Sequence, residues 1–202
     1  MDSTRSNAAL RQFPSGWLVA ALLVASGVVW AVMFFGPLAQ LSHLGGGGAP
    51  FDVRPLGYSY DEARAFLAAI GEQGRHYYGY RQLPLDMIYP PLYAVSRGLA
   101  LWWLTMPGRV RAAPLPRRWR TALVAIPVVM ASLDMIENVC IARMLSTWPE
   151  LSPALVQVAS LATRLKIMAG ALSELSMAVL TVLWLKRRIA DAAGPRERSA
   201  GS

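Results

Sequence analysis

Residues 122–142 read ALVAIPVVMASLDMIENVCIA, and this apolar run decides the fold. A helix rises about 1.5 Å per residue and the hydrocarbon core of a bilayer is about 30 Å thick, so the run is long enough to cross a membrane. It nevertheless contains Asp134, Glu137 and Asn138. An ionised carboxylate at this depth costs about 2.5 kcal/mol or more, so such groups usually face a protein interior or a wet cavity. The run therefore predicts a membrane helix with one polar face.

Three further apolar stretches are long enough to span a bilayer. The first could instead be a secretory signal, but its apolar core exceeds the usual length of about 7–15 residues, and Pro37-Leu38-Ala39 is a poor cleavage site. We expect an all-α integral membrane protein with four transmembrane helices in one membrane domain, residues 1–202. The predicted spans are residues 17–36, 83–106, 121–144 and 160–185, followed by a flexible tail at 186–202.

The short loops predict the orientation. The connection between the second and third spans carries five arginines, and Lys186, Arg187 and Arg188 follow the fourth span. The loop after the third span holds Glu150 and no base. By the positive-inside rule, the basic segments and both termini face the cytoplasm. We expect an integral protein of a bacterial-type plasma membrane. The arginines of the second connection are Arg109, Arg111, Arg117, Arg118 and Arg120.

The formal net charge of +8 resembles that of a nucleic-acid-binding protein until the positions of the bases are considered. Most of the excess lies at the inner membrane edge, where it sets topology and meets anionic lipid head groups. We therefore expect membrane lipids and no nucleic acid as partners. The single cysteine, Cys140, cannot form an intrachain disulfide. His43 and His76 are the only histidines, and neither a metal site nor a cofactor is predicted.

The segment before the second span begins with a helix signal. Ser59 followed by Glu62 is a capping box, in which each side chain bonds the other residue's backbone N–H. Apolar residues then recur at helical spacing, which predicts an amphipathic helix over about 59–82 on the outer surface or over the mouth of the bundle. These apolar residues are Ala63, Phe66, Leu67 and Ile70.

Residues 75–81 read RHYYGYR and combine aromatic rings with cations. An interfacial aromatic belt explains this composition without any ligand. The alternative is a ligand-contacting role, in which His76 could act as an acid or base near neutral pH.

Two prolines shape the second span. Because proline lacks an N–H, Pro90 and Pro91 leave the carbonyls four residues earlier, those of Asp86 and Met87, without their helical donors. Neighbouring helices or water must then supply donors. The side chains of Asp86, Tyr89 and Tyr93 share one helix face, although Asp86 could simply lie at the outer interface.

The polar residues of the third span also share a face. If this helix ends outside near Met144, Asp134 lies about 15 Å deep and Glu137 about 10 Å deep. Two like charges one turn apart repel, so we expect a shared proton or a neighbouring cation.

The fourth helix offers the cation. Ser152-Pro153 is typical of a helix start. We expect Lys166 to reach the acidic face of the third span, with Arg164 joining it or extending to the interface. Glu174 is predicted to be a further buried acid, opposite Arg97 of the second span.

The combined picture is an outward-facing intramembrane polar pocket. A hydrogen-bond and ion-pair network that only holds helices together is the structural alternative, but such bonds average about 0.6 kcal/mol and are a weak reason to bury ionisable groups. The candidate acid–base groups are Asp134, Glu137 and Asp86, and the candidate ligand-binding residues are Tyr89, Asn138, Lys166, Tyr93, Arg164 and His76.

Three function classes remain open. The favoured one is binding or acid–base modification of a lipid-like or hydrophobic small molecule that enters from the bilayer. The others are a non-catalytic scaffold or assembly protein and, less favoured, a proton-coupled transporter, because no inverted repeat is evident. In architecture alone, four spans with buried acids and aromatics resemble the emopamil-binding and sterol-isomerase group, without an aligned motif that would assign a role to any residue. No HExxH zinc pair or Gly-x-Ser-x-Gly elbow is present.

Overall fold

The computed structural model describes residues 14–110 and 115–193, and this part of the chain is all-helical. Three helical segments are long and apolar enough to cross a membrane: Gly16–Leu44, Arg117–Thr147 and Pro153–Ala192. They indicate a membrane protein. The elements are α2 (Gly16–Met33), η1 (Phe34–Leu38), α3 (Ala39–Leu44), η2 (Phe51–Val53), α4 (Tyr60–Ala69), α5 (Gly71–Tyr77), η3 (Tyr78–Gln82), α6 (Leu83–Leu104), α7 (Arg117–Thr147) and α8 (Pro153–Ala193).

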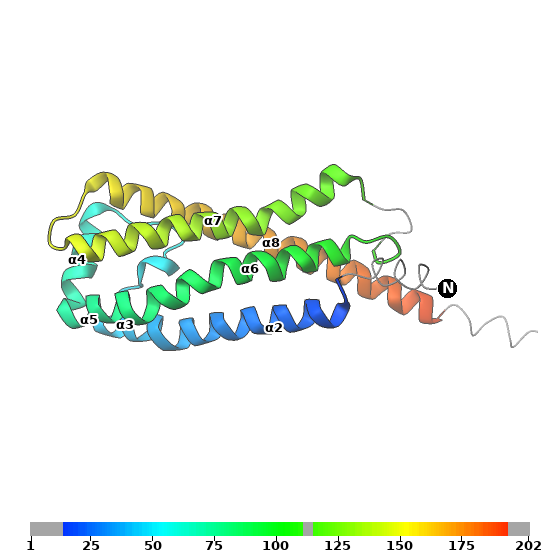
Figure 1. Cartoon of the computed structure of the whole chain (residues 1–202), viewed down its shortest axis with the longest axis horizontal. Helices are drawn as coiled ribbons and strands as arrows, with labels where there is room; N and C mark the ends of the chain where they lie inside the picture. The colour runs from blue at the N-terminus through cyan, green and yellow to red at the C-terminus, as the bar shows by residue number, and fades with distance from the viewer. Residues whose placement is uncertain (1–13, 111–114, 194–202) are drawn as a thin grey trace, which may run out of the picture.

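The long helices α2, α6, α7 and α8 run along the long axis of the molecule, and α3, α4 and α5 gather at one end (Figure 1). α6 packs against α2, α7 and α8, and α7 also packs along α8. Of the arginines predicted to face the cytoplasm, Arg111 lies outside the described residues, as do residues 1–13 and the tail from 194 onward. The others belong to the turn after α6, the start of α7 and the end of α8, which lie at the end of the molecule away from α4 and α5 (Figure 1).

The first helical segment is longer than the predicted span of 17–36. α2 begins at Gly16, and Ser15 caps it, since the Ser15 hydroxyl accepts a hydrogen bond from the N–H of Leu18. A π-helical turn, η1, then contains Pro37, and α3 continues the helix to Leu44. Because Pro37 cannot donate the regular helical bond, a local widening of the turn at this point has a direct chemical cause.

The segment between α3 and α6 folds into several short helices, where the sequence predicted one over 59–82. The capping box is confirmed: Ser59 and Glu62 each bond the backbone of the other at the start of α4. Gly71 has a φ of +66°, a conformation that glycine adopts readily, and the chain changes direction there between α4 and α5. Phe66 packs edge-on against Phe51 of η2, with ring centroids 5.1 Å apart. This packing places η2 close to the ends of α7 and α8.

α6 is not among the segments that meet the length and composition criteria for a span. Its prolines, tyrosines and two charged residues lower its hydropathy. α2, α7 and α8 pack against α6, and Asp86, Tyr89 and Tyr93 are buried on its inner faces, while Ile88 and Val95 remain exposed on its outer face. A helix face covered in this way can carry polar side chains that a lipid-facing surface cannot.

The last two helices extend beyond their predicted bounds. α7 starts at Arg117 rather than 121 and reaches Thr147. α8 begins at Pro153, as the Ser152-Pro153 pair predicted, and the Ser152 hydroxyl accepts the N–H of Leu155. The helix continues to Ala193, so the first part of the tail expected to be flexible from 186 is helical.

Candidate functional site

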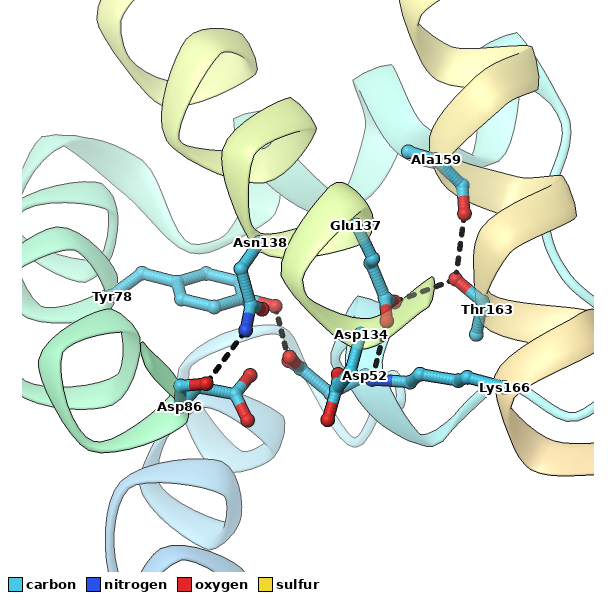
Figure 2. A network of polar contacts seen from close by, with 9 residues as sticks. All are labelled: Asp52, Tyr78, Asp86, Asp134, Glu137, Asn138, Ala159, Thr163 and Lys166. Carbon is cyan, nitrogen blue, oxygen red and sulfur yellow. Dashed lines mark hydrogen bonds and ion pairs between the residues drawn. The ribbon is translucent and has the colours of Figure 1, made fainter. Parts of the chain in front are cut away.

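A buried ion cluster joins α7 to α8. The Lys166 ammonium lies 2.5 Å from Oδ1 of Asp134 and also pairs with Oε2 of Glu137. The exposed fractions of these residues are 5% for Lys166, 1% for Asp134 and 0% for Glu137. The predicted approach of Lys166 to the acidic face of α7 is therefore confirmed, and Figure 2 shows the three side chains meeting between the two helices.

Thr163 completes the back of this cluster. Its hydroxyl oxygen lies 2.6 Å from Oε1 of Glu137 and 2.9 Å from the carbonyl oxygen of Ala159 on its own helix (Figure 2). Thr163 is one α-helical turn before Lys166, so α8 presents both groups on the same face. Both Glu137 oxygens therefore have partners, one on Thr163 and the other on Lys166.

α6 joins the cluster through its proline-containing turn. Asn138 of α7 donates a 2.7 Å hydrogen bond from its side-chain nitrogen to the backbone carbonyl of Asp86. This carbonyl is the one that Pro90 leaves without a helical donor. The Asp86 side chain is 2% exposed and points toward the other acids in Figure 2. The structure thus buries Asp86 among its neighbours, rather than leaving it at an outer interface.

Asp52 is a cluster member that sequence reasoning missed. It lies on η2, it is 8% exposed, and its Oδ2 accepts a hydrogen bond from the hydroxyl of Tyr78 (Figure 2). The sequence pattern assigned no role to Asp52, and it placed Tyr78 only within the aromatic segment 75–81. The signal that could have identified Asp52 as buried is its position between two apolar residues, Phe51 and Val53.

A cavity of about 610 Å³ extends from this cluster between α2, α6, α7 and α8. Ligand pockets of about 300–1,000 Å³ that are mostly apolar and hold a few polar groups are typical small-molecule sites. The polar groups at the cluster end are Asp52, Asp86, Asp134 and Lys166, and the apolar and aromatic walls include Trp30, Met33, Tyr89, Tyr93, Met130 and Ile167.

An ion pair lies farther along the same cavity. The Arg97 Nε is 2.9 Å from Oε1 of Glu174, as the sequence predicted, and both residues line the cavity. The prediction that Glu174 is buried is wrong, because its side chain lies at the open side of the cavity and is 45% exposed. The Arg97 guanidinium also lies over the ring of Tyr93, at 4.9 Å from the centroid. Lys166 and Glu174 are eight positions apart on one helix, so the cavity extends about 12 Å along α8 between its two charged regions.

The cavity is partly open to the surface of the molecule. α2 and α8 both line it, and they are not among the helix pairs that pack extensively against each other. Trp30 on α2 is 46% exposed, and the Glu174 side chain on α8 is 45% exposed. A molecule can therefore reach the cavity from the side of the helices.

The predicted site residues fall into three groups. Asp86, Tyr89, Tyr93, Asp134 and Lys166 line the cavity, whereas Glu137 and Asn138 are buried behind it and hold its polar end together. His76 and Arg164 are not among the cavity-lining residues. His76 is exposed and stacks on Tyr80, and Arg164 is exposed on α8, where its Nε donates to the carbonyl of Ser160.

The cluster contains more acids than bases. Four carboxyl groups, those of Asp52, Asp86, Asp134 and Glu137, meet one ammonium group, that of Lys166. Oδ1 of Asp52 and Oδ2 of Asp86 are buried without a hydrogen-bond partner in the described structure. Buried polar atoms of this kind are rare and call for a proton, a water molecule or a ligand. No group of three or more His, Cys, Asp and Glu residues in the described part of the chain is arranged to hold a metal ion.

No family model matches the chain, and searches of curated proteins and of solved structures return no match.

Proposed function

We propose that this chain is a multi-pass membrane protein whose intramembrane cavity binds a lipid-like or hydrophobic small molecule and modifies it by acid–base chemistry. The observation that carries the proposal is the cavity itself. Its walls are apolar, its inner end is acidic, and two long apolar helices, α2 and α8, contribute the partly exposed residues Trp30 and Glu174 to its lining. A hydrophobic molecule could enter from the bilayer without crossing water.

The proposed topology has four spans, with α6 added to the three candidate spans. Arginines at the end of α6 and the start of α7 lie at the same end of the molecule as the basic residues that close α8 (Figure 1). The positive-inside rule places this end in the cytoplasm, together with both termini. α4 and α5 then lie on the outer side, above the polar end of the cavity.

Asp86 and Asp52 are the proposed acid–base groups that meet the bound molecule. Each has a buried carboxyl oxygen without a partner in the described structure, and both line the cavity. Asp134 lines it as well, but its Oδ1 is already bonded to Lys166. A group within hydrogen-bond reach of a bound molecule can transfer a proton, and protein burial adjusts how readily it does so.

A scaffold or assembly role is the second candidate. The specific observation in its favour is that Glu137 is fully enclosed and joins Thr163 to Lys166 without facing the cavity. Such a network holds α7 on α8 whether or not a ligand is present. A proton-coupled transporter is the third and least favoured alternative.

The experiment that separates these roles is native mass spectrometry of the detergent-purified full chain, with identification of any retained lipid-like molecule. Asp86→Asn changes the acidic end with little change in shape, and Gly170→Leu inserts bulk beside Met130 in the cavity wall. Asp61→Asn, on the exposed face of α4, is the matched control. We expect a molecule retained by wild type and by the control to be lost from both cavity variants.

A binding role fails if folded wild type carries no such molecule and incubation with membrane lipid extract adds none. If Asp86→Asn in addition lowers the midpoint of thermal unfolding, a structural role for the cluster is favoured. An acid–base reaction requires more than retention: the identified molecule should change in mass or double-bond position when it is incubated with wild type, and it should stay unchanged when it is incubated with Asp86→Asn.

A further inference from the structure

A second cavity lies at the opposite end of the molecule from α4 and α5, where the chain leaves α6. Residues 106–109 form a turn in which the Arg109 N–H donates to the carbonyl of Met106 at 3.2 Å. Pro107 and Gly108 are its central residues, and Gly108 has a φ of +81°. This combination is typical of a type II turn, whose third position favours glycine. The turn directs Arg109 back onto α6, where its guanidinium lies 4.1 Å from the centroid of the Trp103 ring.

The end of α8 meets this turn through a second tryptophan. Trp184 packs edge-on against Trp103 with ring centroids 5.4 Å apart. The Arg188 guanidinium lies 5.7 Å from the centroid of the Trp184 ring. Two stacked cation–π pairs therefore hold Arg109 and Arg188 near each other at the adjoining helix ends, because each ring fixes the position of one guanidinium.

The cavity beside these two arginines is basic. It has a volume of about 320 Å³, and Arg109, Arg187, Arg188 and Asp191 line it together with the turn. Asp191 compensates only part of the charge, since its Oδ2 is 3.8 Å from the Nε of Arg187. Partial burial and then the nearby Arg188 lower the pKa of Arg109 below its ordinary value. Burial is the larger cause of this shift and repulsion from Arg188 the smaller one, and a bound anion would relieve the repulsion.

We propose that this basic pocket binds a phosphate group, either of an anionic lipid head group or of a free phosphate. Arginine guanidinium groups present planar pairs of N–H donors that match phosphate oxygens, and three of them converge here. The tryptophans are residues that favour the membrane interface, which is where a lipid phosphate lies. The proposal is independent of the function assigned to the acidic cavity, because the two sites share no residue.

The test measures binding of dioleoylphosphatidylglycerol to the full chain in neutral detergent by native mass spectrometry, with dioleoylphosphatidylcholine as the net-neutral lipid. The pocket variants are Arg109→Gln and Arg188→Gln. The matched control is Arg118→Gln, which removes an exposed arginine at the same end of the molecule but outside the pocket. Unfolding midpoints measured without added lipid verify that each variant is folded. Arg188 is exposed and lies outside the turn, so Arg188→Gln still tests the pocket if Arg109→Gln loosens the turn.

We expect the anionic lipid to bind about tenfold more weakly to each pocket variant than to wild type or to Arg118→Gln, a change of about 1.4 kcal/mol. Competition by sodium phosphate, but not by sodium chloride at equal ionic strength, would show that free phosphate occupies the site. Anionic lipid that stays bound in the presence of sodium phosphate would identify the lipid head group as the ligand. Equal losses in Arg118→Gln and the pocket variants, or no loss in any of them, would overturn the proposal.

Discussion

The side chain of Asn138 on α7 donates to the backbone carbonyl of Asp86 on α6, across 2.7 Å. This carbonyl lacks its helical donor because Pro90, four residues later, has no N–H. The proline and the asparagine therefore form one structural unit on two helices. The proline exposes an acceptor inside the protein, and the asparagine satisfies it while fixing how α6 and α7 face each other.

Replacing Asn138 by alanine should destabilise the protein by about 1–3 kcal/mol, because a buried carbonyl loses its donor. The same replacement in a Pro90→Ala background should cost less, since residue 90 then supplies an N–H to Asp86. Denaturation in detergent of the wild type, both single variants and the double variant measures the coupling. Strictly additive losses would show that the two residues act independently.

Removing the cation of the ion cluster should be more damaging. Lys166→Met leaves Asp134 and Glu137 buried without their shared partner, and breaking a buried pair in this way costs about 3–5 kcal/mol. Neutralising both acids in the same chain, with Asp134→Asn and Glu137→Gln, should restore much of the lost stability. Thermal unfolding of the single and triple variants checks this, and a triple variant no more stable than Lys166→Met would contradict the charge argument.

Gly57→Ala should dislodge the loop before α4 from α8. Gly57 has a φ of +74°, and an added Cβ would lie 2.5 Å from Oγ of Ser160, which accepts the N–H of Tyr58. Gly46→Ala is the control for backbone strain alone, since Gly46 has a φ of +65° and open space around its Cβ position.

We expect Gly46→Ala to cost about 1–2 kcal/mol from strain and Gly57→Ala clearly more. Equilibrium unfolding measures both variants. Equal losses would mean that the contact with Ser160 contributes nothing.

The stability of the cap at the start of α4 should depend on pH. The Ser59 N–H donates to Oε2 of Glu62 at 2.6 Å, and this bond lowers the pKa of Glu62 below its ordinary value. A lowered pKa in the folded state means that the cap is fully stabilising above the unfolded pKa of about 4.3. The stabilisation disappears as the pH falls through the lower folded pKa.

The chemical shift of the Ser59 amide, followed by NMR in micelles, should therefore titrate with a midpoint below the ordinary glutamate value. Glu62→Gln keeps an acceptor at this position but cannot ionise, so its Ser59 amide should lose this titration. A midpoint at or above the ordinary value in the wild type would argue against the capping bond.

Much of the helical framework could be read from the sequence. Apolar runs of sufficient length predicted three helical segments that the structure also identifies as candidate spans, because length and hydropathy are local properties. The cap at Ser59 and the helix start at Pro153 were equally local. The pairing of Lys166 with the acids of α7 also followed from sequence, since a buried charge on one helix requires a partner on another.

The composition of the cavity was decided by tertiary structure alone. Asp52 and Tyr78 join the cluster because Phe51 packs on Phe66 and draws η2 under α7 and α8, and no local pattern encodes that contact. The separation of Asp134, which lines the cavity, from Glu137, which is behind it, depends on how α7 rotates against α8. Sequence determines which polar groups a membrane helix must bury, whereas long-range packing determines which of them meet a ligand.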